Sequence, residues 1–218
     1  NMEDLIDTGT NGPGTVALDL KDRKLYWTTV RRFRADVTSW IHRANLDGTE
    51  RQDIAFFPSR FQSPNNIAID SADGKMYWAM EGKIYRANKD GTNLGVLINL
   101  SIPALGYLPV VVDGQQIYWQ EENKIRRANK DGTNIEDVIT KLEFPHDIAL
   151  DASKGKIYWG DISTLKIQRA NLDGTDIEAI LTGAGYPQHI AIDANGGKIY
   201  WTSGIPNFDR GNRIQRAN

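Results

Sequence analysis

The dipeptide Tyr-Trp occurs five times in this chain of 218 residues. Successive copies are 51, 41, 40 and 42 residues apart and begin at Tyr26, Tyr77, Tyr118, Tyr158 and Tyr200. A period near 40 residues is typical of architectures built from one small sheet per repeat. The chain is therefore predicted to fold as a repeat protein.

Other markers in each repeat predict four strands. An apolar segment ending in Asp, as in residues 67–70, precedes Tyr-Trp and is separated from it by a Gly-bearing turn. Arg-Ala-Asn follows Tyr-Trp and leads into Asp-Gly-Thr, which favours a hairpin because Gly accepts a positive φ. A fourth apolar segment, such as residues 135–139, ends the unit. Each repeat thus reads as an antiparallel meander of strands a, b, c and d, the size of a propeller blade.

The two ends of the chain complete one another. Residues 1–8 read as a d strand with no a, b or c strand before it, and residue 218 lies just after the c strand of the fifth repeat. Pairing these ends would close a ring of five blades and remove exposed sheet edges. We therefore expect one all-β, five-bladed propeller domain over residues 1–218, with blades at 14–57, 64–100, 108–141, 146–182 and 188–218 plus 1–8.

The combined motifs, including Lys156-Ile157-Tyr158-Trp159-Gly160-Asp161, resemble the YWTD or class B repeats of the low-density lipoprotein receptor family. The resemblance implies a propeller that binds proteins at an extracellular, cell-surface or periplasmic location. Family propellers have six blades and Cys-rich neighbours, whereas this chain shows five repeats and no Cys, as a bacterial relative or an excised propeller would. The Asp of the family motif is retained only at Asp161, so any role in joining blades is expected in one blade only; the other copies carry Thr29, Met80, Glu121 and Ser203.

The composition and the absence of certain motifs exclude several classes of function. The net charge is −2, from 26 basic and 28 acidic residues, which gives no bias toward nucleic acid or membranes. No apolar stretch is long enough to predict membrane insertion. The absence of Cys excludes disulfides and thiol chemistry, and the nucleophile-elbow and phosphate-loop motifs do not occur. We therefore expect a protein that is not an enzyme and that has no cofactor or metal.

The repeated residues are predicted to be structural. Tyr and Trp are adjacent on a strand, so they point to opposite faces of a blade and fill the spaces between blades. The Arg of Arg-Ala-Asn is expected to form ion pairs between blades with the Asp that ends strand a. The third repeat is two residues short, which assigns Asp113 to a turn, and His42 on strand c is predicted to lie at the surface. The Asp residues concerned are Asp19, Asp70, Asp151 and Asp193.

Function is expected where the repeats differ. The b–c loops and the d-to-a connections share one end of every blade, which we call the top. The chain takes 16 residues from Trp27 to Arg43 and 15 from Trp201 to Arg216, against 8, 8 and 10 in the other repeats. In a closed ring the two long loops, residues 28–39 and 202–212, would stand side by side.

Arginine and aromatic residues gather in these top segments. Both types dominate binding hot spots, and Arg can clamp carboxylate, sulfate or phosphate groups through paired hydrogen bonds. A solvated loop with Phe57 packed beneath it is the alternative. The candidate binding residues are Arg31, Arg32, Phe33, Arg34, Arg60, Phe61, Phe208 and Arg210.

A second polar set precedes strand a, at the expected mouth of the central channel. Convergent polar groups at such a mouth suit a ligand, a divalent ion or an acid–base pair, and plain lining of a water-filled channel is the alternative. The candidates are Asn66, His146, Asp147 and His189, with Thr15, Asn65 and Gln188 beside them.

These observations predict a binding module whose top face recognises a protein, as an extended or acidic segment. A carbohydrate-binding lectin is the first alternative, since aromatic rings stack on sugars. A lyase or hydrolase using His146, Asp147 and His189 is the second. No nucleic-acid partner is expected, and the oligomeric state stays open.

Overall fold

The structure, a computed structural model, describes residues 4–9, 11–33, 36–58, 63–64, 66–101, 107–204 and 213–218, with only the backbone of Phe33 and Asp36. The described residues form strands and turns, and none of their segments is a helix with the length and apolarity of a membrane span. They divide into two compact units, Asn1–Tyr107 and Leu108–Asn218, each of which is described by itself.

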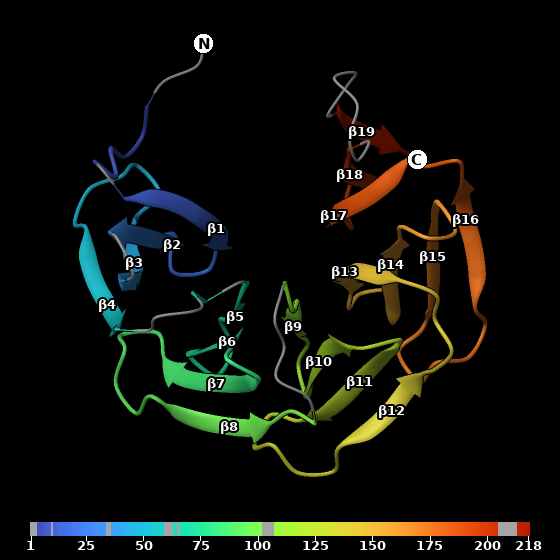
Figure 1. Ribbon diagram of the computed structural model, residues 1–218, viewed down its shortest axis with the longest axis horizontal. Helices are drawn as coiled ribbons and strands as arrows, with labels where there is room; N and C mark the ends of the chain where they lie inside the picture. The colour runs from blue at the N-terminus through green and yellow to red at the C-terminus, as the bar shows by residue number, and fades with distance from the viewer. Residues whose placement is uncertain are drawn as a thin grey trace. The chain divides into compact units, whose positions relative to one another are not determined.

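The first unit holds two antiparallel meanders of four strands (Figure 1). Sheet one has the order β1-β2-β3-β4 and sheet two the order β5-β6-β7-β8, so every strand pairs with its neighbour along the chain. The strands are β1 Gly12–Asp19, β2 Lys24–Phe33, β3 Asp36–Asn45, β4 Gln52–Phe57, β5 Ile67–Asp70, β6 Lys75–Met80, β7 Lys83–Asn88 and β8 Gly95–Asn99.

The second unit holds three more sheets of the same kind. Sheets three and four each have four strands in chain order, and sheet five has the order β17-β18-β19. The strands are β9 Val110–Val112, β10 Gln116–Glu121, β11 Lys124–Asn129, β12 Glu136–Ile139, β13 Pro145–Asp151, β14 Lys156–Asp161, β15 Lys166–Asn171, β16 Glu178–Thr182, β17 Tyr186–Asp193, β18 Lys198–Gly204 and β19 Arg213–Ala217. Five successive meanders are the blades of an all-β propeller, which confirms the predicted fold class.

The predicted closing strand is not found in the described part of the chain. Asp4 to Thr8 form no strand, and sheet five consists of three strands. The segment instead lies against sheet one, where the Asp7 carbonyl accepts a hydrogen bond from Arg51 Nη1 at 3.1 Å. The carbonyl oxygen of Leu5 lies 2.7 Å from the position that a Cβ on Gly48 would take. Residues 4–8 therefore pack on the Asp-Gly-Thr turn of the first repeat.

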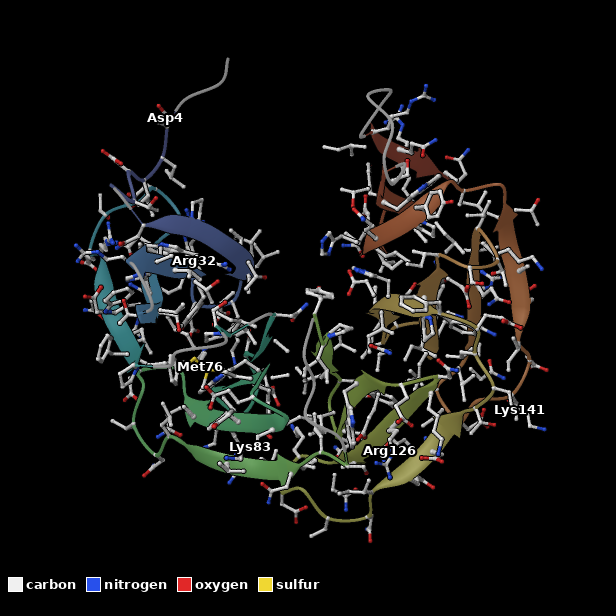
Figure 2. The ribbon with its side chains drawn as sticks, viewed as in Figure 1. Asp4, Arg32, Met76, Lys83, Arg126 and Lys141 are labelled. Carbon is white, nitrogen blue, oxygen red and sulfur yellow. The ribbon has the colours of Figure 1, made fainter. Side chains whose placement is uncertain are left out.

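The Tyr-Trp pairs form the core, as predicted. Tyr and Trp project to opposite faces, and both are buried in sheets one to four. In the second sheet, Trp78 packs with Ile41 and Phe57 of sheet one in a cluster that includes Met76, which is labelled in Figure 2. Trp159 of sheet four packs in the same way on Ile139 of sheet three. The Trp face of one sheet thus covers the outer part of the preceding sheet.

The predicted Arg–Asp ion pairs between blades are wrong for the pairs that the structure describes. Arg43 Nη1 donates instead to the Lys89 carbonyl of the next sheet at 3.0 Å, and Arg127 Nη1 donates to the Leu172 carbonyl at 2.9 Å. Asp151 accepts from its own turn, through the Lys154 amide at 3.2 Å. Asp19 does form an ion pair with the next sheet, but its partner is Lys89, at 2.5 Å, and not an arginine. The arginines Arg43 and Arg127 bind a backbone carbonyl of the next sheet instead.

Sheet three has the irregular first strand that the short third repeat predicts. Strand β9 has only three residues, and Asp113 lies after it in the turn. The Asp113 carboxylate accepts from the amides of Gln115 at 2.8 Å and Gln116 at 2.7 Å. This assignment of Asp113 to a turn is confirmed.

Candidate functional site

The first candidate site lies in the second unit, at the top ends of β13 and β17. Each strand has a Pro among its first two residues and an irregularity in its register just after it, between Pro145 and Asp147 in β13 and between Pro187 and His189 in β17. A bulge of this kind bends the strand and redirects the side chains beside it. The structure thereby brings together three predicted residues, His146, Asp147 and His189.

Asp147 is the buried member of this cluster and joins the two sheets. Its Oδ1 accepts from the Ile148 amide at 2.9 Å, and its Oδ2 accepts from the Ile190 amide of the next sheet at 2.9 Å. The ring Nδ1 of His189 lies 3.6 Å from the same Oδ2. One carboxylate therefore holds backbone amides of β13 and β17, which belong to two neighbouring sheets.

The two histidines are the accessible members. The carboxylate of Asp147 raises the pKa of His189 above its ordinary value, and partial burial of the ring opposes this effect. His146 Nδ1 is 2.7 Å from the carbonyl oxygen of Gln188; a carbonyl only accepts, so this nitrogen carries the proton. The two rings meet edge to face with centroids 5.7 Å apart. The cluster offers a cationic ring at mildly acidic pH beside a second imidazole.

A glycine permits this close approach of sheets four and five. A Cβ added to Gly160 of β14 would lie 2.8 Å from the carbonyl oxygen of Pro187. Any other residue would push β17 away and separate His189 from Asp147. In the sequence, the one signal for this contact is that Gly160 directly follows Tyr-Trp, where the first and fifth repeats have Thr28 and Thr202.

The chemistry of the cluster favours binding over proton transfer. Both oxygens of Asp147 already hold backbone amides, so this carboxylate is a structural anchor. Among the described residues, no group of three or more His, Asp or Glu side chains is arranged to hold a metal ion. Phe144, two residues before His146, is exposed and adds an apolar ring to the same end of the sheet.

The second candidate site is the β2–β3 hairpin of the first unit. Residues 28–39 were expected to be a loop, but β2 and β3 are paired from Lys24 and Asn45 to Phe33 and Asp36. The flanking strands pair only as far as Val30 on β2 and Ser39 on β3, so the remainder is a two-stranded extension. Arg31 and Arg32 lie on this extension, and both are exposed. Figure 2 labels Arg32 there.

Several predicted site residues lie outside the described part of the chain. They are Arg34, Arg60, Phe61, Phe208 and Arg210, together with the side chain of Phe33. Asn66 is described, and its Nδ2 lies 3.3 Å from the hydroxyl of Tyr107 in the same unit. Phe57 is buried and packs edge-on against Trp78, with centroids 5.9 Å apart.

The prediction that His42 lies at the surface is wrong, because its ring is buried on the Trp face of sheet one. It stacks on Trp27 with centroids 5.1 Å apart. Its Nε2 is 2.8 Å from Thr29 Oγ1, and its Nδ1 is 2.7 Å from Asp53 Oδ1. Burial lowers the pKa of His42, and Asp53 opposes this shift. The register could have revealed the contact, since His42 pairs directly with Trp27.

Comparison with known proteins agrees with this geometry. Residues 155–194, which contain Asp161, match the family model of the low-density lipoprotein receptor repeat class B. The chain is 29% identical over 165 residues to the human low-density lipoprotein receptor-related protein 5-like protein, covering 74% of this chain. The chain is a propeller with repeats of the YWTD type, similar to those of this family. It spans 46% of that relative's length, so it corresponds to about half of it.

A second receptor is similar to this YWTD propeller in sequence, and two solved structures are similar to it in fold. Mouse low-density lipoprotein receptor-related protein 5 is 35% identical over 81 residues, which are 37% of this chain and 4% of the receptor. The crystal structure of a nidogen/laminin complex aligns with a TM-score of 0.77 at 25% identity, over 91% of this chain and 74% of that one. TolB from Acinetobacter baumannii aligns at a TM-score of 0.69 and 14% identity, over 90% of this chain and 50% of that one, and shares the fold alone.

The family's Asp has a defined role in this YWTD propeller. Asp161 Oδ2 accepts from the amides of Glu143 at 3.3 Å and Phe144 at 3.2 Å, in the connection from sheet three to sheet four. Its Oδ1 accepts from Ser163 at 3.0 Å and Thr164 at 2.9 Å, in the turn after β14. Asp161 thus ties the link between two sheets to the top of the second sheet.

Proposed function

We propose that this chain is a non-catalytic binding module that recognises an acidic, extended segment of a protein partner. The observation that carries this proposal is the two-stranded extension of β2 and β3, on which Arg31 and Arg32 are exposed. Guanidinium groups bind carboxylates through paired hydrogen bonds, and successive residues on a strand point to opposite faces. An acidic segment can therefore contact the hairpin from either side.

The cluster around His189 supports the same function in the second unit. Its raised pKa gives the exposed ring a positive charge at mildly acidic pH, and Phe144 supplies apolar area nearby. Relatives with receptor names, and a structural neighbour crystallised in a complex with laminin, agree with a protein partner. An extracellular location is proposed on the same family-level grounds.

The test is binding of acidic peptides to a charge-reversed hairpin. The parent and the variant Arg31→Glu/Arg32→Glu are titrated with fluorescent peptides rich in Glu and Tyr, at two salt concentrations. Each exposed Arg–carboxylate pair contributes roughly 0.5–1 kcal/mol, so the double variant is expected to bind about tenfold more weakly. Higher salt is expected to weaken the parent as well.

A matched control separates the hairpin from general charge effects. Lys21→Glu/Arg23→Glu changes the charge by the same amount on exposed residues at the opposite end of sheet one. This control is expected to bind like the parent. Equal losses in both double variants, or no acidic peptide bound by the parent, would sink the proposal.

A carbohydrate ligand is the second candidate, and the exposed Phe144 favours it. Aromatic rings stack on sugar faces, and His146 lies two residues away with a ring that can hydrogen-bond hydroxyls. A glycan array with the purified chain distinguishes the two functions. Binding to a related set of sugars that Phe144→Ala abolishes would replace the protein-partner proposal.

A further inference from the structure

An aromatic pair stands on the outer strands of sheet one, beside the β2–β3 extension. Trp40 of β3 and Phe56 of β4 lie directly opposite each other, and their ring centroids are 5.3 Å apart at an angle of 43°. Trp40 is half-buried, whereas Phe56 is 54% exposed. The next residue, Phe57, points to the opposite face and is buried against Trp78. Trp40 and Phe56 thus form an aromatic shelf that is open to solvent.

This aromatic shelf distinguishes the first repeat from the others. The same two positions hold Lys83 opposite Asn99 in sheet two, and Lys166 opposite Thr182 in sheet four. Asn99 and Thr182 are exposed, as Phe56 is. Exposure at this position is therefore a property of the outer strand of each sheet. Since the fold accepts a polar side chain there, the exposed rings of sheet one are not needed for folding and indicate a binding surface.

A positive charge adjoins the aromatic shelf on the same face of the sheet. Thr29 pairs with Trp40, so Arg31, two residues further along β2, projects on the same side as the shelf. Arg32 projects on the other side. Arg31 is exposed, and the residue opposite it on β3 is the neutral Thr38.

The charge on this face changes sign along the strands. Asp53 of β4 pairs with His42, which lies two residues after Trp40, so Asp53 is on the same face but toward the other end of the sheet. Its side chain is 67% exposed, and its Oδ1 is 2.7 Å from His42 Nδ1. The shelf therefore has a cation at one end and an anion at the other. A carboxylate of a partner is attracted to the Arg31 end.

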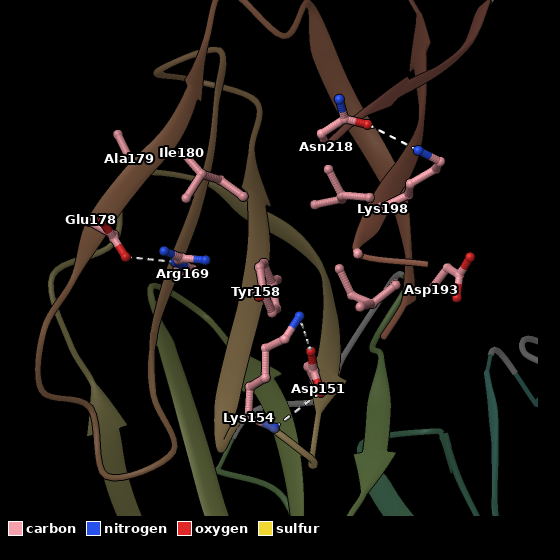
Figure 3. Close-up of a pocket in the computed structure, with 13 residues that line it drawn as sticks. Asp151, Lys154, Tyr158, Arg169, Glu178, Ala179, Ile180, Asp193, Lys198 and Asn218 are labelled. Carbon is pink, nitrogen blue, oxygen red and sulfur yellow. Dashed lines mark hydrogen bonds and ion pairs between the residues drawn. The ribbon is translucent and has the colours of Figure 1, made fainter. Parts of the chain in front are cut away.

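Other arginines on strands of this chain show how such a guanidinium binds a carboxylate. Arg169 Nε donates to Glu178 Oε1 of the neighbouring strand at 2.6 Å, a contact drawn as a dashed line in Figure 3. Arg127 Nε donates to Glu136 Oε1 at 2.6 Å. In both pairs the glutamate stands directly opposite the arginine. Arg31 faces a threonine instead, so the carboxylate that it binds is one that a partner supplies.

We propose, building on the function proposed above, that the acidic segment of the partner carries an aromatic side chain next to a carboxylate and docks on this one face of the hairpin. The aromatic ring packs on Trp40 and Phe56, and the carboxylate accepts from Arg31. Aromatic residues and arginine are the types that dominate binding hot spots, and here they are adjacent. The acidic part of the segment lies toward Arg31 and away from Asp53.

The test is fluorescence anisotropy of two labelled peptides of equal charge, Gly-Glu-Glu-Glu-Tyr-Gly-Gly and Gly-Glu-Glu-Glu-Ser-Gly-Gly, with the purified chain. The tyrosine peptide is expected to bind about three- to tenfold more tightly, because its ring packs on the shelf. Trp40→Lys/Phe56→Asn introduces the pair with which sheet two folds, and it is expected to remove this difference. The added lysine charge acts on both peptides alike. Leu94→Ser, which changes an exposed apolar side chain of sheet two, is expected to leave both affinities unchanged.

Arginine variants locate the carboxylate. Arg31→Gln is expected to weaken binding of the tyrosine peptide about two- to fivefold, the effect of one exposed ion pair. A tyrosine peptide with Gln in place of each Glu is expected to bind the parent and this variant equally. Arg32→Gln, on the other face, is expected to weaken binding of the acidic tyrosine peptide less than Arg31→Gln does.

The outcomes separate this ligand from the proposed function. Equal binding of the tyrosine and serine peptides, or a larger loss in Arg32→Gln than in Arg31→Gln, would overturn the ligand and its face but leave the binding of acidic segments. No binding of either peptide would overturn both proposals. Self-association of the chain that Trp40→Lys/Phe56→Asn abolishes would also overturn this ligand, because a second copy would then occupy the shelf.

Discussion

Replacing Asp161 tests whether one carboxylate fastens the link between sheets three and four. The side chain is buried and accepts four backbone amides. Asp161→Asn keeps an oxygen for the Ser163 and Thr164 amides, but its NH2 group faces the amides of Glu143 and Phe144. Asp161→Ala removes all four acceptors. The asparagine variant therefore loses two of the four hydrogen bonds, and the alanine variant loses all four.

The bond lengths set the expected magnitude. A well-aligned hydrogen bond to a charged group contributes about 1.5–3 kcal/mol, and a long one less. Loss of the two longer bonds, at 3.3 and 3.2 Å, is expected to cost Asp161→Asn about 2 kcal/mol of unfolding free energy. Asp161→Ala is expected to lose about 4 kcal/mol, a large share of the roughly 5–15 kcal/mol of a typical domain.

Urea unfolding followed by circular dichroism measures this loss, and amide exchange locates it. Exchange at Phe144 is expected to quicken in both variants, and at Thr164 chiefly in the alanine variant. Ser203→Ala is the matched control, since Ser203 stands at the same position in sheet five and hydrogen-bonds only Gln215 among the contacts described. It is expected to cost about 1 kcal/mol or less. If Asp161→Ala is no more destabilising than this control, the reasoning is refuted.

Three further predictions concern pH and glycine. Because the pKa of His189 is raised, its ion pair should stabilise the fold below pH about 6.5 and lose this effect as the pH rises through the raised pKa; His189→Gln should abolish the dependence in urea titrations. Because burial lowers the pKa of His42, stability should fall as the pH drops below about 6.5 through the lowered pKa, a fall that should disappear in His42→Gln. Gly174 has a φ of +85°, and an added Cβ would clash with the Val138 carbonyl oxygen, so Gly174→Ala should lower the unfolding free energy by at least about 3 kcal/mol in thermal unfolding. Gly155 has a φ of +62° but lies in open space, so Gly155→Ala should lower it by about 1 kcal/mol. Equal losses in the two variants would contradict the packing argument.

The repeat pattern predicted the sheets because it is local. Tyr-Trp, Arg-Ala-Asn and Asp-Gly-Thr each specify a strand or turn through neighbours along the chain, so strand order and the core followed from them. His42 was misplaced because its burial depends on Trp27, an aromatic partner across the hairpin. Local sequence also does not show which backbone carbonyl an arginine such as Arg43 will reach.

The candidate site was predicted in outline only. Sequence position brought His146, Asp147 and His189 to one end of their sheets, and the structure places them together. The anchoring role of Asp147 depends on the Ile190 amide of the next sheet, a contact that no spacing encodes. The extension of β2 and β3 was expected as a loop, because loop length alone does not distinguish a hairpin from a coil.

The position of Asp161 has a consequence for how such repeats diverge. In other sheets the equivalent residue faces a partner on the adjacent strand, as Glu121 faces Arg126 at 2.8 Å and Ser203 faces Gln215 at 2.7 Å. Each pair is different, and each lies within a single b–c hairpin. A strand transplanted alone between repeats would leave a buried acid or hydroxyl facing the wrong neighbour. The hairpin is therefore the smallest piece that recombination can exchange intact, and repeats can drift apart in sequence while each keeps its own matched pair.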